Sequence, residues 1–251
     1  MQVLLPDKID ILLINCHIAT MANNSLSIIK DAAIAVTGQI ISWVGPKKAL
    51  PRNFQTQNLK PQSFKSSNFK PGYAKIIDCK NRWILPGFVD CHTHLVHGGS
   101  RSNEFEMRLN GTSYEEISKK GGGIFSTVNA TRNSSKKKLY KSASKRVEAL
   151  LKHGTTSLEI KSGYGLNLKT ELKILEVIKQ LDKNFPLHIE ATFLGAHALP
   201  KEFAGNPDGY IDLVTDQMLP EIKDQGIASA VDVFCENIGF SLDQTRKVFE
   251  K

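Results

Sequence analysis

Residues 82–251 alternate between short β-branched runs and amphipathic helical segments, and this alternation constrains the fold more than any other feature. Each of four expected strands is followed by a helical pattern; the strands are "RWILPGFVDCHTH", "TTSLEIKSGYG", "PLHIEATFLGAHALP" and "AVDVFCENIG". Strands separated by helices pair in parallel through right-handed crossovers. The pattern therefore predicts an α/β fold, either an open doubly wound sheet or part of a (β/α)8 barrel.

The carboxyl ends of these strands favour the barrel. No GxGxxG motif follows the first strand, which argues against a dinucleotide-binding sheet. Three of the four strand ends carry a polar or imidazole group beside glycine, and functional residues of barrels lie at that end. We therefore expect about the first four βα units of a (β/α)8 TIM barrel in residues 82–251.

Residues 1–81 have a different texture and predict a small β-sandwich-like domain. Short β-like runs such as "DILLINCHIATM", "AAIAVTG" and "QIISWVG" are punctuated by Gly38 and Gly45, as in a small antiparallel β-unit. Residues 50–74 are rich in Asn, Gln, Ser, Lys and Pro, which is typical of a mobile surface loop.

The composition argues against nucleic-acid and membrane partners. The net charge of +8 lies partly in "SSKKKLYK", a run typical of a solvated helix face. The alternation of arginines with aromatic residues that is typical of nucleic-acid-binding surfaces is not found in the sequence. The four cysteines are far apart without a CxxC pair, which fits a reducing compartment. No apolar run approaches the roughly 18 residues of a membrane span, and no signal peptide is evident. We expect a cytoplasmic protein with no nucleic-acid or membrane partner.

His92 and His94 are the strongest candidates for a metal site. A spacing of two places both side chains on the same face of a strand, about 6–7 Å apart at the Cα atoms. Neutral imidazole suits zinc and iron alike, so the pair does not choose between them. The alternative is two polar residues that hydrogen-bond their neighbours at a strand end. His97 is out of step with this alternation and is expected to be a loop histidine.

Three further residues are candidates for binding a substrate. Arg101 follows glycines beyond the first barrel strand, and its guanidinium suits a carboxylate, although it would otherwise be a solvated loop arginine. Tyr164 lies between two glycines, where its hydroxyl donates to a polar substrate or its ring fills the turn. His197 lies at a strand end, where it would bind metal or substrate.

Several stretches together resemble one family, the imidazolonepropionases of the amidohydrolase superfamily, which act in histidine degradation. The resemblance runs from about residue 82 to the end and is carried by "LPGFVDCHTHLVHGGSRSNEF", "GTTSLEIKSGYGLNLKTELKILEVI", "TFLGAHALPKEF" and "VDVFCENIGFS". It implies hydrolysis of the cyclic amide C–N bond of 4-imidazolone-5-propanoate to N-formimidoyl-L-glutamate. It also implies one divalent or trivalent metal ion as cofactor, zinc or iron.

The resemblance assigns roles to the candidate residues. His92 and His94 match the family's first two metal ligands, and Arg101, Tyr164 and His197 match substrate-binding positions. The bound metal would lower the pKa of a water and polarise the ring carbonyl.

The chain also departs from the family, whose members are much longer. Their third histidine ligand lies on the fifth barrel strand and an aspartate ligand on the eighth, so the remaining ligands and the general base would lie beyond Lys251. No catalytic residue is therefore assigned. The alternatives are a truncated, non-catalytic remnant, one half of a split enzyme, or another cyclic amidohydrolase or deaminase. Proteins of this fold often form dimers, so a homodimer is also an expectation.

Overall fold

The computed structural model describes residues 9–50, 75–113, 116 and 122–251. The chain divides into two compact units, Met1–Pro86 and Gly87–Lys251. The expected mobile loop at 50–74 lies outside the described residues, except for Leu50, which is buried.

The first unit contains one four-stranded sheet in the order β3-β2-β1-β4. Its strands are β1 (Ile11–Ala19), β2 (Ile28–Thr37), β3 (Ile40–Pro46) and β4 (Lys75–Ile84), with 3-10 turns at Ala22–Asn24 and Lys47–Ala49. Strands β1 to β3 pair antiparallel, as the glycine-punctuated runs predict, whereas β4 pairs parallel with β1.

Two small apolar clusters lie on opposite faces of this sheet. Ala33 and Ala35 of β2 pack in one cluster with Leu12 and Ile76, and Ala32 and Ile34 pack in the other. Successive strand residues point to opposite faces, so the run "AAIA" supplies both clusters. The small side chains allow close packing on each side of the strand.

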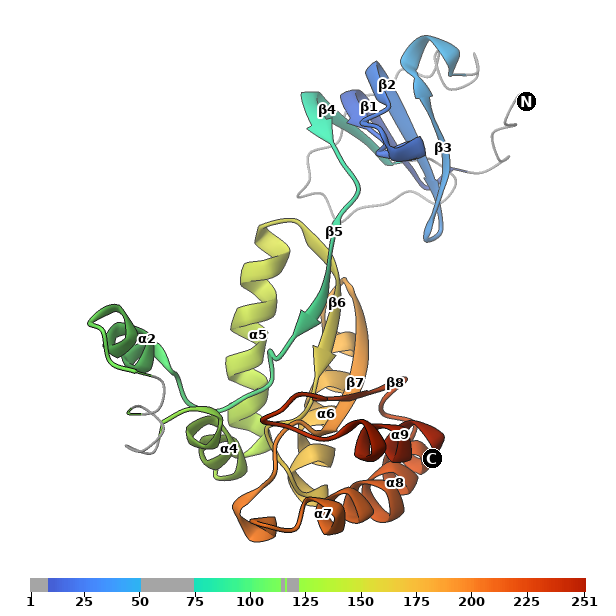
Figure 1. Ribbon diagram of the computed structural model, residues 1–251. Coiled ribbons are helices and arrows are strands. Elements are labelled where there is room, and N and C mark those ends of the chain that lie inside the picture. Colours follow the sequence, from blue (N-terminus) through green and yellow to red (C-terminus); the bar gives the residue numbers. More distant parts are fainter. Residues whose placement is uncertain (1–8, 51–74, 114–115, 117–121) are drawn as a thin grey trace. The chain divides into compact units, whose positions relative to one another are not determined.

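The second unit is built on a parallel sheet in the order β5-β6-β7-β8 (Figure 1). Its strands are β5 (Phe88–Thr93), β6 (Thr155–Lys161), β7 (His188–Ala196) and β8 (Ala230–Val233). The α/β prediction is confirmed, and the sheet forms part of a barrel with its strands in sequential order. The order β5-β6-β7-β8 is the one expected for four consecutive strands of a (β/α)8 barrel.

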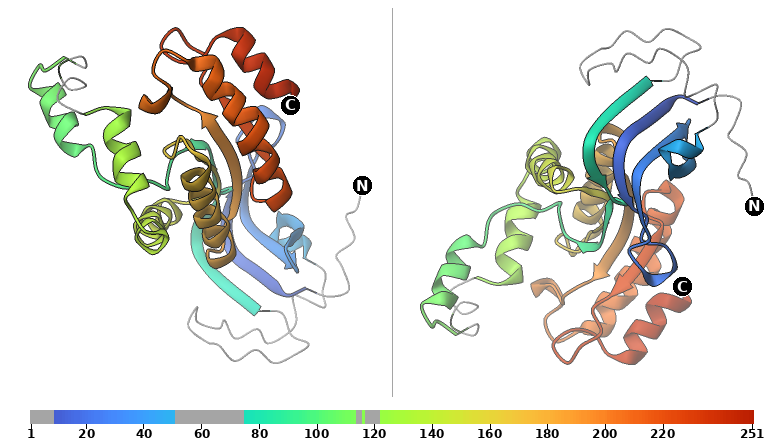
Figure 2. Two further views of the ribbon diagram at one scale, coloured as in Figure 1. Left: turned by 90° about the horizontal axis from the view of Figure 1, so that it is seen from below. Right: turned by 90° about the horizontal axis from the view of Figure 1, so that it is seen from above.

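Helices connect these strands (Figure 2). They are α2 (Ser102–Leu109), α4 (Ile124–Arg132), α5 (Lys136–Lys152), α6 (Leu168–Asn184), α7 (Pro207–Leu213), α8 (Leu219–Gln225) and α9 (Leu242–Glu250). A 3-10 turn at Lys201–Phe203 precedes α7, and a π-helical segment at Val214–Met218 joins α7 to α8. The main core lies between these helices and one face of the sheet, where Leu158, Ile160 and Phe193 are buried.

The helical pattern that follows the first barrel strand is divided into separate helices in the structure. Helix α4 ends at Arg132, and α5 begins after Ser135, whose side chain accepts a hydrogen bond from the Lys138 backbone N–H. A serine that caps a helix N-terminus in this way competes with continuation of the preceding helix. The sequence pattern alone missed this break.

No helix in the described ranges is long and apolar enough to cross a membrane.

Candidate active site

The two histidines of the HxH motif lie together at the carboxyl end of β5. His92 is within the strand and His94 follows its last residue, and their ring centroids are 5.7 Å apart in an edge-on arrangement. The His94 Nδ1 atom is buried and has no hydrogen-bond partner. Burial and the neighbouring imidazoles lower the pKa of His94 to about 3, so its ring is neutral at pH 7. A neutral, unpartnered imidazole nitrogen is chemically suited to bind a metal ion.

His197 and Tyr164 join this pair from the next two strands. The His197 ring stacks on His94 with a centroid distance of 4.9 Å, and the Tyr164 ring lies 5.0 Å from His94 and 5.4 Å from His197. Tyr164 belongs to the turn after β6, and His197 follows the end of β7. The parallel sheet therefore brings four of the five predicted site residues together, His92, His94, Tyr164 and His197, since the carboxyl ends of its strands lie at one end of the sheet.

The His197 ring is oriented by the backbone. Its Nδ1 lies 2.8 Å from the Gly163 carbonyl oxygen. A carbonyl oxygen only accepts hydrogen bonds, so Nδ1 carries the proton and Nε2 keeps a lone pair. Burial lowers the pKa of His197, which keeps the ring neutral. His197 can therefore accept a hydrogen bond at Nε2 from a ligand.

His97 borders the same group of rings. Its ring centroid lies 6.0 Å from that of Tyr164, and its Nδ1 lies 3.1 Å from the carbonyl oxygen of the adjacent Gly98. The structure therefore places this loop histidine beside the aromatic cluster formed by His92, His94, Tyr164 and His197.

Arg101 is placed differently from the other predicted residues. It immediately precedes helix α2, and its Nε donates to Glu104 Oε2 at 2.7 Å. The Arg101 charge lowers the pKa of Tyr164, against the larger opposing effect of burial. Arg101 thus acts electrostatically on the Tyr164 hydroxyl, while its carboxylate partner in this structure is Glu104, which the sequence analysis did not identify.

A group of three charged residues on the sheet, centred on the buried Lys161, was also missed from the sequence. Lys161 of β6 donates to Glu159 at 2.6 Å and contacts Asp232 of β8 at 3.0 Å. Residues two apart on a strand share a face, so the spacing of Glu159 and Lys161 in "EIK" is the signal that could have placed these two side chains together. Lys161 contributes to the lowered pKa of His94, and Asp232 opposes the lowering at His197, so this group influences the site through its charges.

These residues fit part of a metal site. His92 and His94 offer two imidazoles, whereas a catalytic zinc site usually has three protein ligands and one open position. Within the described ranges, no group of three or more His, Cys, Asp or Glu side chains is arranged to hold a metal ion. The described residues therefore bring together two imidazoles suited to a metal ion, and a complete site of this kind needs at least one more ligand.

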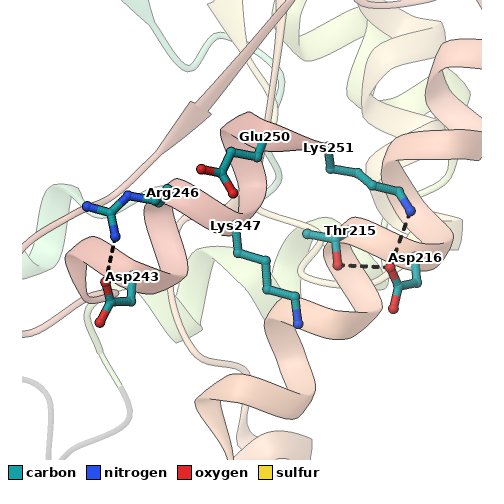
Figure 3. Close-up of a pocket in the computed structure, with 7 residues that line it drawn as sticks. All are labelled: Thr215, Asp216, Asp243, Arg246, Lys247, Glu250 and Lys251. Carbon is teal, nitrogen blue, oxygen red and sulfur yellow. Dashed lines mark hydrogen bonds and ion pairs between the residues drawn. The ribbon is translucent and has the colours of Figure 1, made fainter.

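A surface cavity at the C-terminal helix has a different character (Figure 3). Its walls carry charges of both signs, and Lys251 reaches Asp216 of the π-helical segment at 3.5 Å while Arg246 pairs with Asp243. The lining residues are Thr215, Asp216, Asp243, Arg246, Lys247, Glu250 and Lys251. Because no imidazole lines it and it lies away from the ends of β5, β6 and β7, this cavity is not the site of the expected chemistry.

Comparison with known proteins gives the fold class first. No family model matches the chain. A triazine hydrolase from Arthobacter aurescens has a similar structure, with a TM-score of 0.55 and 16% sequence identity, over 97% of this chain and 50% of that chain. That likeness concerns the fold alone. It supports a partial α/β barrel for this chain.

Sequence comparison then finds curated relatives. Imidazolonepropionase from Colwellia psychrerythraea is 48% identical over 241 residues, which are 95% of this chain and 54% of that protein. Those from Pseudomonas fluorescens and Pseudomonas aeruginosa are 46% and 47% identical, each over 94% of this chain and 54% of their own length. The chain is a homologue of the imidazolonepropionases and spans about half the length of the curated relatives it matches.

Proposed function

We propose that this chain is the N-terminal, metal-binding half of an imidazolonepropionase. The complete protein would hydrolyse the cyclic amide C–N bond of 4-imidazolone-5-propanoate to N-formimidoyl-L-glutamate. The observation that carries the proposal is the cluster of His92, His94, Tyr164 and His197 at the ends of three consecutive parallel strands. Identity of 46–48% to imidazolonepropionases supports the choice of substrate.

The cofactor would be one zinc or iron ion held by His92 and His94. When bound, such an ion supplies a water of lowered pKa and polarises the ring carbonyl. The unpartnered His94 Nδ1 and the lowered pKa of its ring support this assignment, because the nitrogen is available without first losing a proton. The remaining ligands and the general base would come from outside this chain.

The other predicted residues would hold the substrate. His197 accepts at Nε2, since its Nδ1 proton is engaged by Gly163, and Tyr164 donates its hydroxyl to the polar ring. Arg101 binds the propanoate carboxylate. Its bond to Glu104 uses Nε, so the terminal nitrogens are directed to a second carboxylate. These contacts would fix the cyclic amide beside the metal-bound water.

A second candidate is a non-catalytic remnant or one half of a split enzyme. The observation that favours it is length, because the chain covers only 54% of each relative and presents two imidazole ligands. We further infer a cytoplasmic location, supported by four free cysteines, and we keep a homodimer as an expectation.

Both candidates are tested by the reading frame that follows Lys251 and by an assay of imidazolone hydrolysis. The reading frame beyond Lys251 is sequenced, and the complete protein is assayed with zinc or iron by loss of the imidazolone absorbance. We expect the reading frame to continue with a further strand-end histidine and a later aspartate. We also expect the complete protein to turn over the imidazolone and the His94→Ala variant to lose this activity. Residues 1–251 expressed alone should be inactive. Metal-dependent turnover by this chain alone would contradict the half-enzyme proposal, and a stop codon directly after Lys251 would favour the remnant or a split gene.

A further inference from the structure

The turn that carries Tyr164 is held by a buried carboxylate outside the aromatic cluster. The turn is "SGYGL", residues 162–166, between β6 and α6. Three of its backbone N–H groups donate to Glu171: Gly163 at 2.9 Å, Gly165 at 2.7 Å and Leu166 at 2.8 Å. Glu171 lies in the first turn of α6 and is completely buried. One side chain thus satisfies the amides on both sides of Tyr164.

The carbonyl groups of the same turn are bound from other directions. Arg132, the last residue of α4, donates from Nε to the Gly165 carbonyl at 2.7 Å and from Nη2 to the Leu166 carbonyl at 3.2 Å. The Gly163 carbonyl accepts from His197 Nδ1. Gly163 is therefore a direct link, because its N–H bonds Glu171 and its carbonyl orients the His197 ring.

The conformation of the turn requires both glycines. Gly163 has a φ of +103°, and a Cβ there would lie 2.7 Å from the Leu194 carbonyl oxygen. A Cβ on Gly165 would lie 2.8 Å from Glu171 Oε1. Leu166 also has a positive φ, +52°, which is unfavourable for a branched side chain. Such a backbone persists only where surrounding contacts hold it, and Glu171 supplies three of them.

We infer that Glu171 is a positioning residue that fixes Tyr164 and His197 in the substrate-binding geometry by anchoring Gly163, Gly165 and Leu166. The inference rests on the proposed function for the roles of Tyr164 and His197. A role limited to helix capping would direct the carboxylate to the first amides of α6. Instead, the carboxylate bonds the turn before the helix, and its effect reaches the imidazole on the next strand.

Glu171→Gln is the sharpest substitution, because it keeps size and removes one acceptor. The two carboxylate oxygens face opposite donors, Gly163 on Oε2 and Gly165 with Leu166 on Oε1. A glutamine presents one oxygen and one NH2 group, so an amide donor faces a backbone donor in either orientation. The matched control is Glu176→Gln on the same helix, where the carboxylate pairs with Lys136 at 2.6 Å and both side chains are largely exposed.

The first measurement uses the 251-residue chain and needs no activity. Amide hydrogen exchange at Gly163, Gly165 and Leu166 should be at least about tenfold faster in Glu171→Gln, the loss expected for about 1.4 kcal/mol of local opening. Nuclear Overhauser contacts between the Tyr164 and His197 rings should weaken in the same variant. Glu176→Gln should match the wild type in both. Unchanged exchange together with unchanged ring contacts would overturn the inference.

The second measurement uses the complete enzyme and a double-mutant cycle with Tyr164→Phe. Glu171→Gln should lower kcat/KM roughly 10- to 100-fold when Tyr164 is present, the scale for a misplaced binding group. It should have a much smaller effect in the Tyr164→Phe background, because the misplaced hydroxyl is already absent. Equal losses in both backgrounds would indicate a purely structural role and contradict the inference.

Failure of the Glu171→Gln variant to fold, or inactivity of the complete wild-type protein, would each leave a measurement that still tests the inference. If Glu171→Gln does not fold, Arg132→Lys replaces it, since lysine keeps the charge but cannot bond the Gly165 and Leu166 carbonyls as a fork. Arg132→Lys should then give the same non-additivity with Tyr164→Phe. If the complete wild-type protein does not hydrolyse the imidazolone, the proposed function fails, and the exchange and ring-contact measurements alone decide whether Glu171 positions the turn.

Discussion

The imidazole rings of His94 and His197 stack, with centroids 4.9 Å apart and planes inclined by 10°. The two residues follow β5 and β7, and β6 lies between those strands in the sheet. Two charged imidazolium rings would repel at this distance, and the His197 ring contributes to lowering the pKa of His94. The stack therefore favours neutral rings, the state that binds metal and accepts hydrogen bonds.

Loss of the HxH pair should abolish metal binding. The His92→Ala, His94→Ala double variant of the complete protein should retain less than about a tenth of the wild-type zinc or iron, because two ligands of one ion are removed. Elemental analysis of the purified proteins measures this. The control is His188→Ala, an exposed histidine at the opposite end of β7, which should keep the wild-type metal content. Equal metal in the double variant and the wild type would contradict the prediction.

Arg101→Met should weaken transition-state stabilisation in the complete enzyme. We expect a loss of roughly 2–4 kcal/mol in kcat/KM, the scale for removing one partner of a desolvated charge pair. Steady-state kinetics on imidazolonepropanoate measures it. Arg108→Met on the same helix, where the side chain is exposed, should change kcat/KM little. An unchanged kcat/KM for Arg101→Met would refute the assigned role.

Tyr210→Phe should lower the free energy of unfolding by about 1–3 kcal/mol. The Tyr210 hydroxyl is buried and donates to the Gly195 carbonyl at 2.7 Å, so its removal leaves a buried acceptor without a partner. Urea unfolding of both proteins measures the change. Tyr140→Phe is the control, because the Tyr140 hydroxyl bonds the exposed Asn184 amide and its loss should cost less than about 0.5 kcal/mol.

Cys16 should make the first unit less stable at high pH. Burial raises the pKa of the Cys16 thiol to about 11, and its Sγ bonds the Ala32 carbonyl. The unfolded thiol ionises at its ordinary pKa near 9, while the folded thiol keeps its proton. The thiol's contribution to stability is therefore present below pH 9 and is lost as the pH rises towards 11.

Urea midpoints of the first unit at pH 8 and pH 10.5 measure this effect. The fall in midpoint between these pH values should be smaller in Cys16→Ala than in the wild type. A thiol reagent provides a second check, since exposed Cys91 should react at pH 8 much faster than buried Cys16. Equal pH dependence in the two proteins, or equal reaction rates of the two thiols, would show the prediction to be wrong.

Local periodicity was sufficient for much of this molecule. Alternating strands and helices predicted the α/β unit, and the two-residue spacing of His92 and His94 predicted that their rings share a face. Strand ends beside glycine pointed to Tyr164 and His197 as site candidates. The fold and the shared face are confirmed because strand and helix periods determine which side chains share a face before any long-range contact forms, while the roles of Tyr164 and His197 stay predictions.

Local periodicity does not reveal features that depend on a few polar atoms, such as a break between two helices or the direction of strand pairing. Helical propensity continues through residues 124–154, yet the Ser135 cap interrupts it. The glycine-punctuated runs predicted the antiparallel pairing of β1 to β3, but they gave no direction for β4. This strand pairs parallel with β1, and strand composition does not specify the direction of a partner that comes later in the chain.

The sequence by itself predicted the α/β class of fold, the shared face of His92 and His94, and the resemblance to the imidazolonepropionases. Only the tertiary structure decided which distant groups complete the site: Glu171 and Arg132 around the Tyr164 turn, Asp232 beside Lys161, and Glu104 on Arg101. Asp232 is 71 positions from Lys161, and Arg132 bonds a carbonyl 33 positions away. No local period encodes such pairs, because they form only when the sheet order brings separate strands and helices to one edge and burial makes each polar group find a partner.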